Sequence, residues 1–307
     1  MALTETPTRA TACLETLIDG LHARERLRVW SIVITVYGDS ILPRGGVLWL
    51  GALQVLLERL RIEPGALRAA MSRLASDSWL IRDRRGRRSY YALSEQGRRS
   101  FGVATRRIYA AGPLQWDGTW TICVVPEEAG EARDARRKAL RERGFGTLGP
   151  TVFCRPETEA APDANGCLDG AVVFSARAAT PEQLSQLTSA AWPLAETAAA
   201  YDEITAAFSP LFEALKAGEV LDPLAAMAAR TLLIHEYRRA ALKDPLLPPD
   251  LLPPQWPGGR ARQVTADLYR ALVTGSEVWL DACDPAPDGA LPPVSVEFRS
   301  RFGGLDL

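Results

Sequence analysis

Residues Ile62–Leu93 read IEPGALRAAMSRLASDSWLIRDRRGRRSYYAL, and this stretch decides the interpretation of the N-terminal part of the chain. Pro64 stands where the first turn of a helix tolerates proline. The apolar residues that follow it recur at the spacing of one helix face: Leu67, Ala70, Met71 and Leu74. Two strand-like segments come next, around residues 79–81 and 91–93, joined by an arginine-rich turn over 83–88. This order, a helix followed by a β-hairpin wing, predicts a winged helix-turn-helix domain.

The same region carries a concentrated positive charge. Between Arg61 and Arg107 there are twelve Arg, no Lys and four acidic residues, which gives the segment a net charge of +8. Because the whole chain has a net charge of −1, the remainder sums to −9. Arginine replaces lysine almost throughout the chain, so its abundance alone would indicate only a solvated surface. Its clustering on an otherwise acidic protein is typical of a surface that binds a polyanion.

The outward face of the predicted helix and the wing supply the candidate contacts with DNA. A helix fits the major groove and reads base edges, while phosphate contacts position it. Guanidinium groups in a wing suit phosphates or a narrow minor groove. The predicted DNA-binding residues are Arg68, Ala69, Ser72 and Arg73 on the helix and Arg84, Arg85, Arg87 and Arg88 in the wing. For any single arginine, a solvated surface charge is an equally good interpretation.

The segments around this stretch complete the predicted domain. Residues 26–38, RLRVWSIVITVYG, could form a buried strand, but their helical periodicity and the following Gly38-Asp39 favour a first helix that stops there. Of Tyr90 and Tyr91, we expect one to be exposed and the other to lie in the core. The other expected elements are a loose start over 1–11, a helix around 14–21, a turn over 43–46, and helices over 49–60 and from Ser94 onward.

The rest of the chain divides into a mixed part and a helical part. Strands are expected over 120–125, 148–154 and 170–177, and helices over 128–143 and from 181, with a surface loop over 155–169. This β-α-β-β-α order suggests a ferredoxin-like sandwich. Further helices are expected over 194–215, 222–242 and 264–279, with a Pro-rich connector over 244–259 and a loop-like tail over 284–307. The predicted fold class is α+β, with domains at 1–112, 113–180 and 181–307.

His235 is the most informative titratable residue outside the basic region. It lies on the inward face of a predicted helix, so a buried, hydrogen-bonded structural histidine is the favoured interpretation. The alternative is a polar contact in an apolar pocket for a small ligand. The candidate effector-binding residues are His235, Tyr237, Arg238, Arg239 and Trp256. Aromatic residues such as Tyr201 and Phe208, which could wall such a pocket, would serve equally well as core.

Several kinds of chemistry are not indicated. Gly144–Gly149 matches GxGxxG, but it follows a predicted helix and precedes a strand, which is the reverse of the dinucleotide fingerprint. Five cysteines without CxxC spacing argue for reduced thiols, and two histidines argue against a multi-histidine metal site. With no expected cofactor, catalytic motif, signal peptide or membrane span, we expect a cytoplasmic protein.

Motifs along nearly the whole chain resemble the PaaX family of phenylacetic-acid-degradation repressors. The matching stretches are Gly38-Asp39, PRGGVLWLG (43–51), GRRSYYALSEQGRRSF (86–101), WDGTW (116–120), RGFGTLGPTVFCRP (143–156) and LIHEYRRAALKDPLLPPDLLPPQWPG (233–258). The resemblance implies a winged-helix DNA-binding domain, a Cas2-like ferredoxin middle domain and a helical C-terminal domain. It also implies DNA contacts from Gly65–Ser76 and Arg84–Arg88.

The function implied by the resemblance is a dimeric repressor on a palindromic operator. Such a repressor would control an aromatic, phenylacetate-type catabolic operon and leave the DNA when an aryl-acyl-CoA such as phenylacetyl-CoA binds. The outward face around Ala69 and Ser72 carries smaller and less polar side chains than the family resemblance leads one to expect. The operator sequence and the acyl group of the effector are therefore left open. The alternative is a metal-dependent nuclease or an acyl-CoA-binding enzyme built on the Cas2-like domain. The absence of Asp and Glu from Thr119–Pro126 argues against a nuclease.

Overall fold

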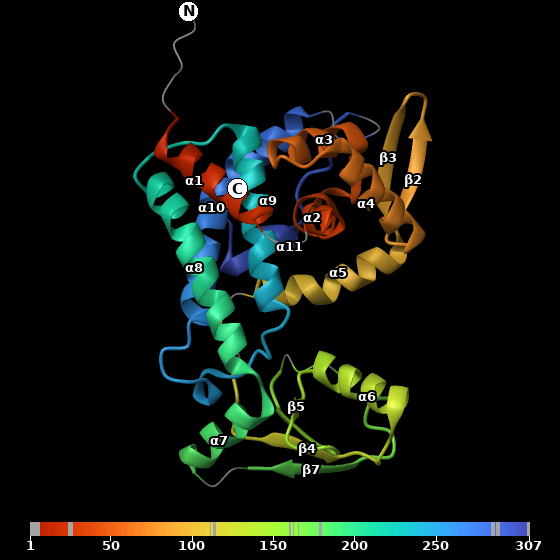
Figure 1. The fold of residues 1–307 in the computed structure, drawn as a ribbon, viewed down its shortest axis with the longest axis vertical. Coiled ribbons are helices and arrows are strands. Elements are labelled where there is room, and N and C mark those ends of the chain that lie inside the picture. The colour runs from red at the N-terminus through yellow and green to blue at the C-terminus, as the bar shows by residue number, and fades with distance from the viewer. Residues whose placement is uncertain are drawn as a thin grey trace, which may run out of the picture. The chain divides into compact units, whose positions relative to one another are not determined.

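The computed structural model describes residues 7–305 except 24–26, 111, 113–114, 160, 162, 165, 178–179, 284–285 and 287–288 (Figure 1). Residues 1–6, expected to be loose, and Arg26, at the start of the first predicted helix, lie outside the described residues. The chain packs into two compact units. Unit 1 comprises Met1–Ala111, Tyr201–Leu242 and Gly259–Leu307, and unit 2 comprises Gly112–Ala200 and Lys243–Gly258. The division into three domains stays a prediction about chain segments.

Unit 1 contains a winged helix-turn-helix, as the sequence predicts (Figure 1). Its elements are β1 (Val47–Trp49), α3 (Leu50–Arg59), α4 (Pro64–Ser76), β2 (Leu80–Arg85) and β3 (Arg88–Leu93). The sheet has the order β1-β3-β2, and both pairings are antiparallel. Strand β1 was not predicted, because three residues between a turn and a helix are too few to show a period of two.

The wing differs from its prediction in two ways. Strand pairing continues to Arg85 and Arg88, so the turn is the two-residue Gly86-Arg87, with Gly86 at φ +60°, rather than 83–88. Tyr90 and Tyr91 are also both buried, where one was expected to be exposed. The reason is that β3 is the central strand, flanked by β1 and β2 and packed against α3.

The first helices of unit 1 lie where helices were predicted, but the first begins at Arg9, inside the segment 1–11 that was expected to be loose. Helix α1 (Arg9–His22) is capped by the Thr8 side chain, and α2 (Val29–Val36) lies inside 26–38. The predicted helix stop at Gly38-Asp39 is wrong. Helical structure continues there through a π-helical turn η1 (Tyr37–Ile41) and a 3-10 turn η2 (Leu42–Arg44). The helical structure can continue because buried side chains, and not water, form the hydrogen bonds of the Asp39 carboxylate.

The C-terminal helices belong to the same unit as the winged helix. After α5 (Glu95–Ile108), they are α8 (Leu194–Lys216), α9 (Pro223–Ala241) and α10 (Gly258–Ala282), of which α8 enters unit 1 at Tyr201. Helix α9 is buried on nearly every side and contacts α1, α2, α3 and α5. Within the described residues, no helix is long and apolar enough to cross a membrane.

The tail was predicted to be loop-like, and that prediction is wrong in part. Residues 296–299 form the short helix α11 (Val296–Arg299), and the turn η4 (Arg301–Gly303) follows. Phe298, Arg301 and Phe302 are buried. Aromatic and charged side chains in this segment find partners on distant helices, which local periodicity does not register.

A buried ion network joins these parts, with Asp39 at its centre. The Asp39 carboxylate accepts hydrogen bonds from Arg230 Nε at 2.7 Å and Arg301 Nη1 at 3.0 Å. It also accepts from the hydroxyls of Tyr109 at 2.6 Å and Tyr269 at 2.9 Å. Burial by itself would raise the pKa of Asp39, but the two guanidiniums and two hydroxyls outweigh it and hold that pKa below its usual value. The carboxylate is therefore ionised inside the core.

Unit 2 is a small α+β sandwich. Its elements are β4 (Trp120–Val124), α6 (Gly130–Glu142), β5 (Gly146–Thr147), β6 (Val152–Pro156), β7 (Val172–Ala176), α7 (Pro181–Ala191) and the 3-10 turn η3 (Pro249–Leu251). The strand order β5-β6-β4-β7 is that of a ferredoxin-like sheet. Between β6 and β7 the described residues form no helix, and β6 extends two residues into the predicted loop.

The GxGxxG stretch has a packing role in this sheet. It follows α6 and contains β5, as expected for a segment that is not a dinucleotide fingerprint. A Cβ at Gly146 would lie 2.6 Å from the Trp192 ring and 2.7 Å from the Ala191 methyl group. Glycine therefore allows the two-residue strand to approach the apolar cluster built around Trp120 and Trp192.

Candidate nucleic-acid interface

Helix α4 presents its polar face to solvent, as the sequence predicts. Leu67, Ala70, Met71 and Leu74 are buried against the rest of the domain. Arg68, Ala69, Ser72 and Arg73 are all exposed. Arg73 lies with its guanidinium carbon 5.0 Å from the centre of the Trp30 ring, and its Nε is 3.4 Å from Asp77. The structure thus brings the four helix candidates onto one accessible face.

The wing brings the other four candidates together on a hairpin. Arg84, Arg85, Arg87 and Arg88 are all exposed, and strand alternation places them on both faces of the ribbon. Arg84 Nε donates to the Gly86 carbonyl at 3.3 Å, and Arg85 Nε lies 3.0 Å from Asp83. The guanidinium of Arg88 lies over the Trp49 ring, 4.7 Å from its centre. These contacts hold several of the wing arginines in defined positions.

Arg68 and Arg87 differ from the neighbouring arginines in their contacts. Within the part of the chain that the structure describes, neither side chain makes a hydrogen bond, an ion pair or a ring contact. An exposed guanidinium without a partner can donate to a phosphate or a base edge without first breaking an internal contact. These two residues are therefore the best-placed donors for a bound polyanion.

Sequence reasoning missed three residues of this surface. Arg82, on β2, is exposed and donates to Ser89 Oγ at 2.9 Å, so the basic hairpin begins earlier than predicted. Trp30 and Trp49 are half-buried and lie beneath Arg73 and Arg88. The basic run from Arg82 onward was a usable signal for the first. The contacts of Arg73 with Trp30 and of Arg88 with Trp49 depend on tertiary packing, so no spacing in the sequence predicts them.

The HEYRR segment packs against helix α2 of the winged domain. His235 is 5% exposed, and its Nδ1 lies 3.1 Å from Thr35 Oγ1 on α2. Arg238 Nε donates to the same hydroxyl at 2.8 Å, and Arg238 Nη2 donates to the Ser31 carbonyl at 2.9 Å. Burial lowers the pKa of Arg238. The structural interpretation of His235 is the one that this geometry supports.

The other candidate effector residues lie in different surroundings. Tyr237 is buried and its ring lies 6.2 Å from that of Tyr201, while Arg239 is exposed and forms an ion pair with Glu236 at 3.5 Å. Trp256 belongs to unit 2, where it packs against the Trp120 cluster. The candidate set therefore does not form one site within either unit.

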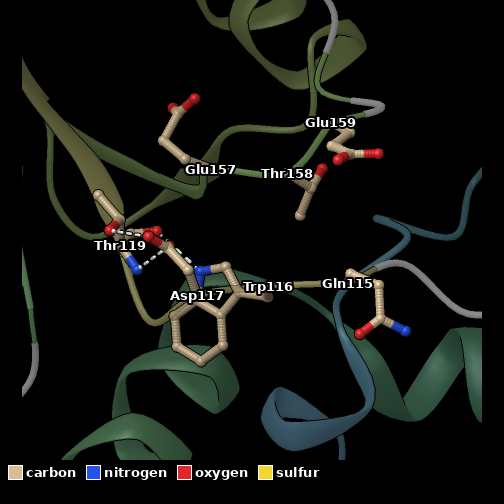
Figure 2. Close-up of a pocket in the computed structure, with 7 residues that line it drawn as sticks. All are labelled: Gln115, Trp116, Asp117, Thr119, Glu157, Thr158 and Glu159. Carbon is tan, nitrogen blue, oxygen red and sulfur yellow. Dashed lines mark hydrogen bonds between the residues drawn. The ribbon is translucent and has the colours of Figure 1, made fainter.

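An open pocket of about 470 Å³ lies in unit 2 (Figure 2). It is lined by Gln115, Trp116, Asp117, Thr119, Glu157, Thr158 and Glu159. Hydrogen bonds from the Thr119 amide and hydroxyl lower the pKa of Asp117, whose carboxylate also pairs with Arg177 at 3.0 Å. Glu157 accepts from Thr121 and Arg155. These carboxylates have protein partners, and the described residues include no group of acidic, His or Cys side chains arranged to hold a metal.

Comparison with known proteins finds matches along most of the chain. Three family models match consecutive segments: PaaX-like protein over residues 28–97, the PaaX protein central Cas2-like domain over 113–186, and the PaaX-like protein C-terminal domain over 192–282. The chain is 35% identical over 286 residues to the transcriptional repressor PaaX of Escherichia coli strain K12, covering 90% of each chain.

A solved structure supports the fold. An uncharacterized protein of Mycobacterium tuberculosis superposes with a TM-score of 0.56 at 21% identity, covering 81% of this chain and 97% of that one. At that identity the likeness bears on the fold alone.

Proposed function

The chain belongs to the PaaX family, and on that premise we propose that it is a transcriptional repressor that binds operator DNA through α4 and the wing. The observation that carries this proposal is the shared exposure of the α4 face and the arginine-rich hairpin within the +8 segment, while the remaining residues sum to −9. Such a distribution directs DNA to one surface. Because the E. coli relative, which aligns over 90% of its length, is a transcriptional repressor, an enzymatic role for the Cas2-like domain is not part of the proposal.

The test is binding of labelled duplexes by fluorescence anisotropy, with the upstream region of the protein's own gene and an unrelated duplex of equal length. We expect log Kd to rise with log salt by about 0.9 for each neutralised phosphate. Absent or salt-insensitive binding of the upstream duplex would contradict the proposal.

Arg68 and Arg87, to which the described residues offer no partner, can distinguish base contacts from phosphate contacts. Arg68→Ala, on the helix, should weaken binding to the upstream duplex more than to the unrelated one, because base contacts carry specificity. Arg87→Ala, at the wing turn, should weaken both duplexes alike and lower the salt slope by about 1. Arg260→Ala, an exposed arginine on α10, is the matched control and should change neither. Equal behaviour of the first two variants would refute this division of labour.

The proposal extends to a dimer on a palindromic operator of a phenylacetate-type operon, in the cytoplasm, with an aryl-acyl-CoA such as phenylacetyl-CoA as the releasing ligand. Support comes from the family resemblance and from the packing of the HEYRR segment on α2, which joins α9 to the winged domain. Release requires that the thioester bind the DNA-free conformation more tightly than the DNA-bound one. A thermal-shift and anisotropy series with CoA, phenylacetate and phenylacetyl-CoA tests it, and no selective effect of the thioester would count against that ligand.

A further inference from the structure

Trp49 lies at the base of the wing in an orientation fixed by its neighbours. It ends β1 and is paired in register with Tyr90 on β3. Arg88 is two residues before Tyr90, so both project from the same face of the strand, and Arg88 is the diagonal neighbour of Trp49. The guanidinium carbon of Arg88 lies 4.7 Å from the centre of the Trp49 ring. At this distance a cation and an aromatic face attract each other.

Gly51 supplies a second, independent observation. A Cβ at residue 51 would lie 2.3 Å from Cζ2 and 2.5 Å from Cη2 of Trp49, closer than atoms can approach. The indole therefore rests on the backbone of Gly51, at the second residue of α3. Glycine weakens a helix relative to alanine, so its use here costs helix stability. In return, the Trp49 ring occupies the position that places it under Arg88.

The charges at the tip of the hairpin show why Arg88 needs such a support. Arg85 and Arg88 are register partners, and like charges directly opposite each other are unfavourable. Arg85 Nε lies 3.0 Å from Asp83, and Arg88 lies on the Trp49 ring. A guanidinium held over an aromatic ring loses less side-chain freedom when it binds a phosphate.

We propose that Trp49 is a positioning residue for DNA binding, which holds Arg88 ready to bind a phosphate of the duplex. The inference rests on the proposed function, since it concerns the same DNA-binding surface. Trp49 acts through Arg88.

The experiment measures duplex affinity and melting temperature for six variants of the chain, one of which is a control. Trp49→Leu should weaken binding about fivefold, and Trp49→Phe should recover most of the loss, because a phenyl ring retains a cation-binding face. Arg88→Ala should weaken binding at least as much, and the double variant Trp49→Leu/Arg88→Ala should be no weaker than Arg88→Ala alone, since the two residues act as one unit.

The most informative variant is Gly51→Ala, which displaces the indole without removing it. We expect about threefold to fivefold weaker DNA binding with little change in melting temperature, because the half-buried Trp49 ring can turn toward solvent and alanine favours the helix, whereas the Phe101 ring beside Gly38 is buried. Gly20→Ala in α1, where a Cβ meets nothing within 4 Å, is the matched control and should leave affinity unchanged.

Full affinity of Gly51→Ala or Arg88→Ala, or losses from Trp49→Leu and Arg88→Ala that multiply in the double variant, would overturn the positioning role while leaving the proposed function intact. Failure of the wild-type chain to bind DNA would overturn the proposed function itself, and this inference with it.

Discussion

Replacing Asp39 by Asn tests the claim that a buried ion network holds the winged helix to the C-terminal helices. Asn occupies the same volume but removes the negative charge, and its amide N–H groups would face other donors. Arg230 is 0% exposed and Arg301 is 4% exposed, so neither guanidinium can turn to solvent for compensation. Two buried cations would then share the interior with a neutral amide.

The size of the effect follows from the burial of the partners. Removing one partner of a buried ion pair typically costs about 3–5 kcal/mol, because the remaining charge is left uncompensated. Asp39 has two cationic partners, at 2.7 and 3.0 Å, and the ion pair of Arg230 with Glu277 at 2.7 Å offsets part of the loss. We therefore expect the free energy of unfolding of unit 1 to fall by about 3–5 kcal/mol. For a body of this size, that lowers the melting temperature by about 6–20 °C.

The assay is thermal and urea unfolding followed by circular dichroism, with Asp19→Asn as the matched control. Asp19 forms an ion pair with Arg61 at 2.7 Å, but both side chains are about half exposed or more (68% and 48%), so its loss should cost about 0–1 kcal/mol. A cost for Asp39→Asn that is below about 1 kcal/mol, or no larger than that of Asp19→Asn, would refute the reasoning.

Three further predictions concern pH, packing and thiol reactivity. Because the pKa of Asp39 is lowered in the folded state, its carboxylate contributes its full stabilisation above the ordinary pKa of about 3.9. That contribution is lost as the pH falls through the lower folded-state pKa. The difference in the free energy of unfolding between wild type and Asp39→Asn should therefore be constant at neutral pH and narrow below about pH 4, in acid titrations followed by circular dichroism. Gly38→Ala should destabilise the protein by about 1–3 kcal/mol in urea unfolding, because the new Cβ would lie 2.5 Å from the Phe101 ring, and an unchanged midpoint would contradict that packing. Burial, and then the neighbouring thiol, raise the pKa of Cys154 to about 12, so iodoacetamide should modify the half-buried Cys13 at least about tenfold faster in the native protein, as mass spectrometry would show; equal rates would contradict the burial.

The sequence by itself determined the elements whose two faces differ. In α4, Leu67 and Met71 alternate with Arg68 and Ser72 at helical spacing, so both the helix and its exposed face could be predicted from a dozen residues. The wing followed from two short apolar segments around a glycine and arginine turn. For the same reason, the candidate DNA-binding residues were found on accessible surface, although their contact with DNA stays a prediction.

Tertiary structure alone decided the roles of the charged and aromatic residues between elements. Asp39 looked like a helix stop because its partners Arg230, Tyr269 and Arg301 lie 191, 230 and 262 positions further along the chain. Trp49 looked like the first apolar residue of a helix, and only packing places its ring under Arg88. Periodicity reports which side of an element is apolar. It does not report which distant partner a buried charge or ring meets, because that depends on how the elements pack.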